Sequence, residues 1–224
     1  MEHQVQVWKG IFKPKETVHT LRESTNLHGY RIRMLILLLS STIVFGFLFY
    51  ISAAEWLNMP EATEMKLSKE QQQAASILIG VCGALSGLII PFLFIGLAAL
   101  SSWTFFRDIG YKKLFVLNTY LYVIVLVGLT ANLPFMLKFG STEMLSPFGL
   151  GPWVSLLTDN VFLYSLSGWI TLFFIWHLYA STRLLQVASL KSNRYVRTVT
   201  ILLHFGFIVI VALINSLYHM HLNG

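Results

Sequence analysis

Charged side chains are scarce in this chain: Asp, Glu, Lys and Arg together make up only 12% of its 224 residues, while 55% are hydrophobic. An ordinary soluble domain carries about 25% charged residues. The composition therefore excludes that class and indicates an integral membrane protein. The net charge of +6 does not indicate nucleic-acid binding, because basic residues at the ends of membrane spans orient membrane proteins and attract anionic lipid headgroups.

Groups that carry covalent chemistry are also missing. Cys82 is the only cysteine, which excludes an internal disulfide. The sequence has no glycine-rich phosphate loop, no His-Glu-x-x-His pattern and no Gly-x-Ser-x-Gly turn. His219, Met220 and His221 could contribute to a soft-metal site, but no third strong ligand lies near them. We therefore predict that the protein is not an enzyme and holds no metal ion or cofactor.

Long apolar stretches without charge are what the sequence has in abundance. Five are long enough for the roughly 20 residues that cross a bilayer: Met34–Ala54, Ala74–Phe106, Leu114–Leu137, Asn160–Thr182 and Thr198–Gly224. They predict an all-α, polytopic integral membrane protein with five transmembrane helices, at about 34–54, 76–103, 114–136, 160–181 and 198–218. The second stretch is longer than the hydrocarbon requires, so its helix must tilt, bend or extend beyond the core.

The distribution of basic residues predicts the orientation. Thirteen of the sixteen Lys and Arg residues fall in the N-terminal segment and in the segments 107–113 and 183–197. The three segments that alternate with these contain only the other three. Because cytoplasmic segments are enriched in Lys and Arg, the N-terminus is predicted in the cytoplasm and the C-terminus outside.

Two parts of the chain differ in character. Residues 1–33 are predicted to form a cytoplasmic basic segment, and residues 34–224 a single transmembrane domain. Val18 and Leu21 would share one side of a helix that begins near Pro14, so the basic segment is expected to be amphipathic. It could anchor to the membrane surface or dock a partner through its aromatic, proline and basic residues, namely Trp8, Phe12, Lys13, Pro14, Lys15, Arg31 and Arg33.

Polar groups inside apolar spans are costly and therefore mark candidate sites. No Asp, Glu, Lys or Arg lies centrally in a predicted span, which argues against a proton-coupled or ion-coupled transporter. His177 and His204 are predicted at similar depth in adjacent antiparallel spans. They could form a functional pair, or two neutral histidines hydrogen-bonded across helices. Asn118 and Asn215 are predicted to form helix–helix hydrogen bonds.

Small residues mark one face of the second predicted span. Gly83 and Gly87 form a small-xxx-small pattern that Gly80 extends, and such a face lets helix backbones approach closely. Pro91 follows and is expected to kink the helix. The glycine face could pack against another helix of the chain, against a second copy or against a partner protein's helix.

The segments between spans carry structural signals of their own. Residues 68–73 predict a capped helix start, and Pro134 is expected to bend or end the third span. The segment 138–159 contains glycines and prolines that break regular structure, together with apolar side chains that suit the bilayer surface. A short interfacial helix is expected from Trp153, while entry of this segment into the bilayer stays open.

The opening of the chain resembles a known family. The run Trp8-Lys9-Gly10-Ile11-Phe12-Lys13-Pro14-Lys15-Glu16-Thr17, ahead of the first of five spans, is similar to the short bacterial branch of the Yip (Ypt-interacting protein domain) family. The resemblance implies a five-span, multi-pass protein of the bacterial cell membrane with a cytoplasmic N-terminus and no known catalytic activity. Eukaryotic relatives act with Rab GTPases in membrane trafficking. Some bacterial relatives accompany ABC exporters and help with resistance to peptide toxins.

The residues and the resemblance together predict a non-catalytic membrane protein that works through helix packing and partner binding. The suspected partner is an ABC exporter involved in toxin resistance, for which this chain would be an accessory or assembly factor, and self-association is the other option. The alternative is a small transporter or channel subunit that moves an unidentified solute. For that alternative, His177, His204, Asn118 and the expected kink at Pro91 are the relevant features.

Overall fold

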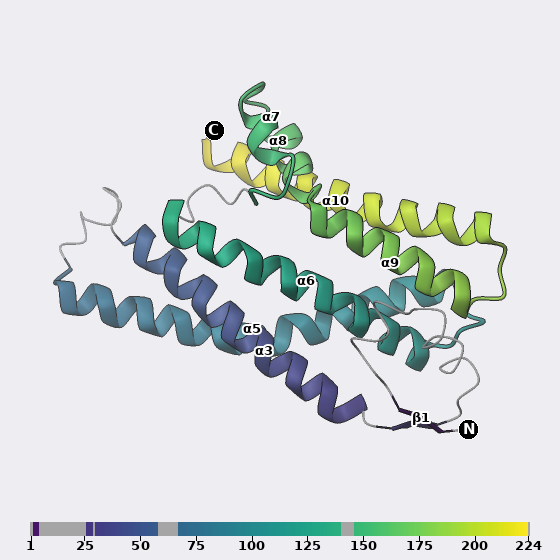
Figure 1. Ribbon diagram of the computed structural model, residues 1–224. Coiled ribbons are helices and arrows are strands. Elements are labelled where there is room, and N and C mark those ends of the chain that lie inside the picture. The colour runs from purple at the N-terminus through teal and green to yellow at the C-terminus, as the bar shows by residue number, and fades with distance from the viewer. Residues whose placement is uncertain (1, 5–25, 29, 58–66, 140–145, 224) are drawn as a thin grey trace. The chain divides into compact units, whose positions relative to one another are not determined.

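The structure is a computed structural model that describes residues 2–4, 26–28, 30–57, 67–139 and 146–223 (Figure 1). This part of the chain is predominantly helical, and four of its helices are long and apolar enough to cross a membrane. The predicted all-α membrane class is confirmed at that level.

Near the N-terminus, two three-residue strands, β1 (Glu2–Gln4) and β2 (Asn26–His28), pair in parallel. The run from Trp8 to Lys15, which carries the family resemblance and most of the predicted surface anchor, lies outside the described residues. The amphipathic helix expected there stays a prediction.

Two compact units make up the chain, and each is described by itself. One contains residues 1–28, 98–125 and 145–224 and is called the first unit; the second unit contains residues 29–97 and 126–144. The helices α5 (Lys69–Phe105) and α6 (Tyr111–Phe139) each begin in one unit and end in the other. They extend the helices predicted over 76–103 and 114–136 at both ends.

The second unit contains α3 (Tyr30–Trp56) and most of α5. The start of α5 is fixed by a reciprocal cap. The backbone N–H of Ser68 donates to the side-chain oxygen of Gln71 at 2.8 Å, and the Gln71 N–H donates to the Ser68 hydroxyl at 3.3 Å. This capping box confirms the predicted helix start. Pro91 lies inside α5, which remains helical through it.

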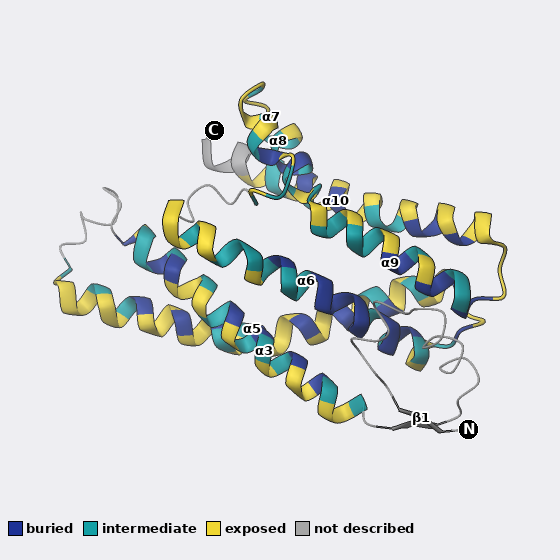
Figure 2. Cartoon of the chain, viewed as in Figure 1, coloured by how far each residue is buried: buried dark blue, intermediate teal, exposed yellow. Residues whose placement is uncertain are grey.

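Residues 114–124 of α6 lie in the core of the first unit (Figure 2). Leu114, Leu117 and Tyr120 are almost completely buried, and their spacing places them on one side of a helix. Pro134 is expected to bend or end the third span; it does not end the helix, because α6 continues to Phe139, and the bend stays a prediction.

Four more helices complete the first unit: α7 (Gly151–Ser155), α8 (Val161–Trp169), α9 (Leu172–Ala188) and α10 (Asn193–Asn223). The long α10 packs along both α8 and α9, and α7 packs on α8 (Figure 1). α7 contains Trp153, which confirms the short helix expected there. The helix predicted over 198–218 lies within α10.

The continuous fourth helix predicted over 160–181 is wrong, because α8 ends before Ile170 and a new helix starts at Leu172. Thr171 has an extended backbone, with φ −106° and ψ 165°, and its hydroxyl accepts the N–H of Phe174 at 3.0 Å. It is therefore the N-cap of α9. Hydropathy could not reveal this break, because the residues on both sides of it are apolar.

Candidate functional site

The glycine face of α5 packs against α3. A Cβ added at Gly83 would lie 2.4 Å from the Cβ of Phe49. A Cβ added at Gly87 would lie 2.7 Å from both the carbonyl oxygen of Ser41 and the Cα of Thr42. Distances below 3.0 Å are essentially never seen for real Cβ atoms, so any side chain at these two positions would push the helices apart. The absence of side chains is what lets the two backbones meet.

The same contact is looser beyond these two glycines. A Cβ at Gly80 would lie 3.2 Å from the Cβ of Tyr50, and a Cβ at Gly46 of α3 would lie 3.4 Å from the Cβ of Ala84. Gly46 therefore contributes a small residue from the opposite helix. Of the options left open by the sequence, the structure uses the glycine face for packing within the chain.

His177 of α9 and His204 of α10 meet across the helix contact. The Nδ1 atom of His177 lies 3.1 Å from the Nε2 atom of His204, and the Nδ1 atom of His204 lies 2.8 Å from the carbonyl oxygen of Thr200. A carbonyl oxygen can only accept, so Nδ1 of His204 carries a proton. In the neutral pair, His204 then accepts through Nε2 and His177 donates through Nδ1. The predicted hydrogen bond across helices is confirmed in geometry.

One aromatic ring packs against this histidine pair, and others lie along the same contact with α10. Phe174 makes edge-to-face contacts with the rings of His204 and Phe205, at centroid distances of 6.1 Å and 5.9 Å. One turn away, Trp169 makes an edge-to-face contact with Phe207 at 6.2 Å. These contacts hold α9 and the end of α8 against α10. The imidazole pair therefore lies beside aromatic side chains in the contact between α9 and α10.

The two asparagines singled out from the sequence differ in their partners. The side-chain amide of Asn215 on α10 donates to the hydroxyl of Ser165 on α8, which confirms the predicted helix–helix hydrogen bond. The amide of Asn118 instead donates to the carbonyl oxygen of Leu114 on its own helix, at 2.9 Å. The predicted helix–helix hydrogen bond of the Asn118 amide is therefore wrong: the amide bonds within its own helix, because a backbone carbonyl four residues earlier is within reach of a short polar side chain.

Asp108 is a residue that sequence reasoning missed. One of its carboxylate oxygens accepts the Ser189 hydroxyl at 2.8 Å and the Leu190 N–H at 2.6 Å. It thereby joins the α5–α6 turn to the turn between α9 and α10. Partial burial raises the pKa of Asp108, but the hydrogen bonds from Leu190 and Ser189, with the nearby charge of Lys191, outweigh burial and lower the pKa below its ordinary value. The sequence offered one signal for this site: Asp108 is the only acidic residue in the basic segment 107–113.

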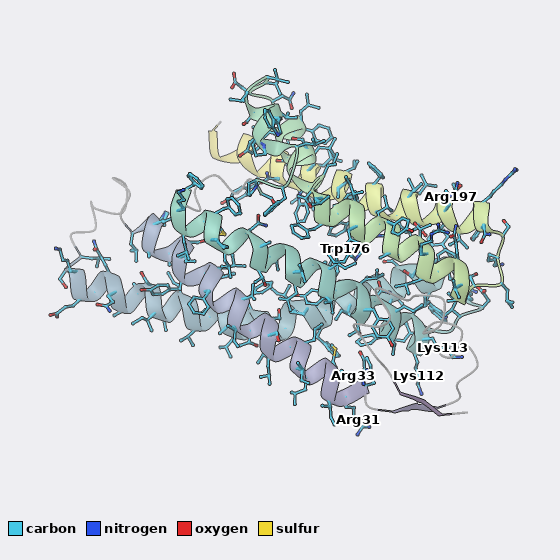
Figure 3. The ribbon with its side chains drawn as sticks, in the orientation of Figure 1. Arg31, Arg33, Lys112, Lys113, Trp176 and Arg197 are labelled. Atoms are coloured by element: carbon cyan, nitrogen blue, oxygen red, sulfur yellow. The ribbon has the colours of Figure 1, made fainter. Side chains whose placement is uncertain are left out.

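Basic side chains lie near helix ends in both units. In the first unit, Lys112 and Lys113 at the start of α6 and Arg197 near the start of α10 lie toward the same end (Figure 3). In the second unit, Arg31 and Arg33 lie in the first turn of α3 (Figure 3). Among the described residues, four other cations lie over nearby aromatic rings: Arg107 over Trp103, Lys138 over Phe139, Arg183 over Tyr179 and Lys191 over Tyr195.

Within the described residues, no group of three or more His, Cys, Asp or Glu side chains is arranged to hold a metal ion. The side chains of His219, Met220 and His221 lie outside the described ones. Comparison with known proteins found no matching family model, no matching curated protein and no matching solved structure.

Proposed function

We propose that the chain is a five-span protein of the bacterial cell membrane with its N-terminus in the cytoplasm and its C-terminus outside. Four spans correspond to α3, α5, α6 and α10, which are long and apolar enough to cross a bilayer. The fourth crossing in chain order is made jointly by α8 and α9, which follow one another along α10. The excess of Lys and Arg in alternate segments supports the orientation.

Within that topology, the protein functions by binding a partner in the membrane and performs no catalysis. The observation that carries this proposal is the α3–α5 pair. Its small residues are used for the contact between the two helices, and large apolar side chains are left on the outer surface of the pair. On α5 these exposed side chains recur every three or four residues, at Leu78, Val81, Leu85, Ile89 and Leu93. Such a stripe is the kind of surface on which a partner's transmembrane helix packs.

The partner class we propose is an ABC exporter, as the family resemblance implies, and the chain would act as its accessory or assembly factor. Helix association inside a bilayer depends on close packing and interhelical hydrogen bonds, since lipid tails are as apolar as the helices. Loss of side-chain volume along the outer stripe should therefore weaken the complex without altering the α3–α5 contact.

The test is affinity purification of the tagged full chain from its native membrane in mild detergent, followed by mass spectrometry. We expect a stoichiometric ABC exporter with the natural sequence, and its loss when Leu78, Leu85 and Ile89 are replaced by Ala. A triple variant on α10, with Leu202, Ile210 and Leu213 replaced by Ala, removes equally exposed apolar side chains and serves as the control. Recovery of no partner above background, or equal loss with both variants, would overturn the proposal.

A second candidate function is transport, as a small carrier or channel subunit. The specific observation in its favour is the hydrogen bond between His177 and His204, because imidazole can both accept and release a proton. A proton arriving at Nε2 of His177 would let its Nδ1 proton pass to Nε2 of His204. Ionisable groups inside membrane segments commonly mark such pathways.

Purified protein in liposomes that contain a trapped pH-sensitive dye tests this second function. An imposed pH difference should collapse faster than in empty vesicles, and His177→Leu should abolish the acceleration. Asn215→Leu removes a different hydrogen bond, between α10 and α8, and should leave the acceleration unchanged. Equal rates in protein-containing and empty vesicles would rule out proton movement through the pair.

A further inference from the structure

The loop ahead of α7 is bonded to the break between α8 and α9. The N–H of Leu150 donates to the carbonyl oxygen of Ile170 at 3.1 Å, and the N–H of Leu172 donates to the carbonyl oxygen of Phe148 at 2.9 Å. Between them, Gly149 and Thr171 form an antiparallel bridge. A Cβ at Gly149 would lie 3.0 Å from the methyl carbon of Thr171 and 3.4 Å from the carbonyl oxygen of Ile170, so the loop lies close against the break.

These bonds satisfy the peptide groups that the helix break would otherwise leave open. A continuous helix pairs its own N–H and C=O groups, whereas a break inside hydrocarbon exposes unpaired polar groups, which lipid cannot satisfy. The loop supplies one donor to Ile170 and one acceptor to Leu172. Such pairing is required if the break lies at membrane depth, and would be dispensable if water reached it.

The depth of the break follows from its register with α10. On one side of the break, Phe174 contacts Phe205. On the other side, Ser165 bonds to Asn215, and Trp169 next to the break contacts Phe207. Antiparallel helices advance equally along their axes. Ile170 therefore lies at the level of residues 207–210 of α10.

That level is close to the middle of the membrane span. The predicted fifth span covers residues 198–218, and Ile208 is its central residue. The break and the backbone of residues 148–150 therefore lie near the bilayer midplane. The start of α8 at Asn160, about nine residues of helix or roughly 14 Å farther along the same axis, lies toward the outer surface.

Apolar side chains on the outside of this segment match that depth. Leu150, Trp153, Leu156 and Leu157 are 49%, 68%, 79% and 84% exposed within the chain. In water such a cluster would be unfavourable, because its apolar surface would stay in contact with solvent. In lipid hydrocarbon it carries no such penalty.

We infer that residues 146–157 re-enter the bilayer from the outer side, with Phe148–Leu150 near the midplane and the exposed side chains of residues 150–157 in contact with lipid acyl chains. This inference rests on the proposed topology, since α10 supplies the scale of depth. The segment binds lipid hydrocarbon, and its loop backbone completes the broken fourth crossing.

Site-directed spin labelling tests the inference with the full chain in liposomes. Cys82 is exposed and would react, so it is first replaced by Ala. Single cysteines are then placed at Leu150, Trp153, Asp159 and Ile210, each carrying a nitroxide. Collision with oxygen, which concentrates in hydrocarbon, is compared with collision with a polar nickel chelate, which stays in water.

We expect the label at Leu150 to match the label at Ile210, an exposed residue of α10 at the level of the break. Both should collide mainly with oxygen, while the label at Asp159 should collide mainly with the nickel chelate. The label at Trp153 should also collide mainly with oxygen, as the label at Leu150 does. The test therefore stays informative if one of the two substitutions prevents folding. A label at Leu150 that behaves like Asp159, with Ile210 still in lipid, overturns re-entry alone. Nickel access at Ile210 as well overturns the topology.

Discussion

The α3–α5 contact and the contact of α8 and α9 with α10 hold helices together in different ways. The first depends on glycines whose missing side chains allow backbone atoms to touch. The second contains histidine, asparagine and serine side chains that bond across the interface, set among aromatic rings. One contact is defined by shape and the other by polar partners.

The difference shows how each contact should respond to change. Close packing without side chains tolerates no added volume, because the neighbouring atoms belong to backbone or to Cβ positions that cannot rotate away. A polar contact tolerates volume better, and each interhelical hydrogen bond contributes only about 0.6 kcal/mol in a membrane protein. Substitutions should therefore have large effects at the glycine contact and graded effects at the polar one.

The largest effect is expected from Gly83→Leu and Gly87→Leu. Each would introduce atoms closer than 3.0 Å to α3, at a cost of about 1–3 kcal/mol or more from overpacking. Thermal unfolding of the purified protein in mild detergent should show a clear fall in Tm or loss of folded protein. Gly206→Leu on α10 is the matched control, because a Cβ there meets no atom within 4 Å. Gly80→Ala should lower the Tm by an intermediate amount. A decrease in Tm for Gly206→Leu as large as for Gly83→Leu would contradict the role of close packing.

The sequence predicted the glycine contact well in one respect and poorly in another. The spacing of Gly83 and Gly87 identified the face, because small residues one turn apart must share a side of a helix. It could not identify α3 as the partner, since Gly46 stands alone between Phe45 and Phe47 without a repeating pattern. Which helix fills a face depends on tertiary arrangement.

For the polar contact, the depth of His177 and His204 could be read from antiparallel connectivity, and so their pairing was predictable. The break at Ile170 was not predictable, because a single Thr in an apolar run also occurs inside unbroken membrane helices. Asp108 was also missed, since its partners, Ser189 and Leu190, lie far away in the chain. Hydropathy records how apolar a segment is, and caps and long-range hydrogen bonds leave no trace in it.

The second largest effect is expected at the cap of α9. Thr171→Ala removes the hydroxyl that accepts the Phe174 N–H, and loss of such a cap costs about 1 kcal/mol. Thr182→Ala is the control, because its hydroxyl donates only to the carbonyl oxygen of Leu178 one turn earlier in the same helix. Thermal unfolding should rank Thr171→Ala as less stable than Thr182→Ala. The reverse order would show that the cap at the break contributes little.

A smaller effect is expected from the histidine pair, where a double-mutant cycle isolates the bond. His177→Leu, His204→Leu and the double variant should show a coupling free energy of about 0.6 kcal/mol, typical of interhelical hydrogen bonds in membranes. Reversible unfolding in detergent gives the required free energies. Pairing His177→Leu with Asn215→Leu, which removes a separate bond, should give additive effects. Coupling indistinguishable from zero in the first cycle would leave aromatic packing as the source of the contact.

The smallest effect is expected at Asp108, which joins the α5–α6 turn to the turn between α9 and α10, and this effect depends on pH, unlike the effect at the glycine contact. Its carboxylate accepts hydrogen bonds from Ser189 and Leu190 beside Lys191, which hold its pKa below the ordinary value of 3.8. A lowered pKa in the folded state means that ionised Asp108 stabilises the fold at pH values above 3.8. That stabilisation is lost as the pH falls below 3.8 and through the folded-state pKa.

Thermal unfolding between neutral and acidic pH should therefore show a difference in Tm between the natural protein and Asp108→Asn, and this difference should narrow as the pH falls. Gly83→Leu removes no ionisable group and should keep its gap at every pH. Because Asp159→Asn changes an exposed carboxylate at the start of α8, its curve should follow the natural protein throughout, and a narrowing gap there would trace the effect to general charge instead of the Asp108 bonds.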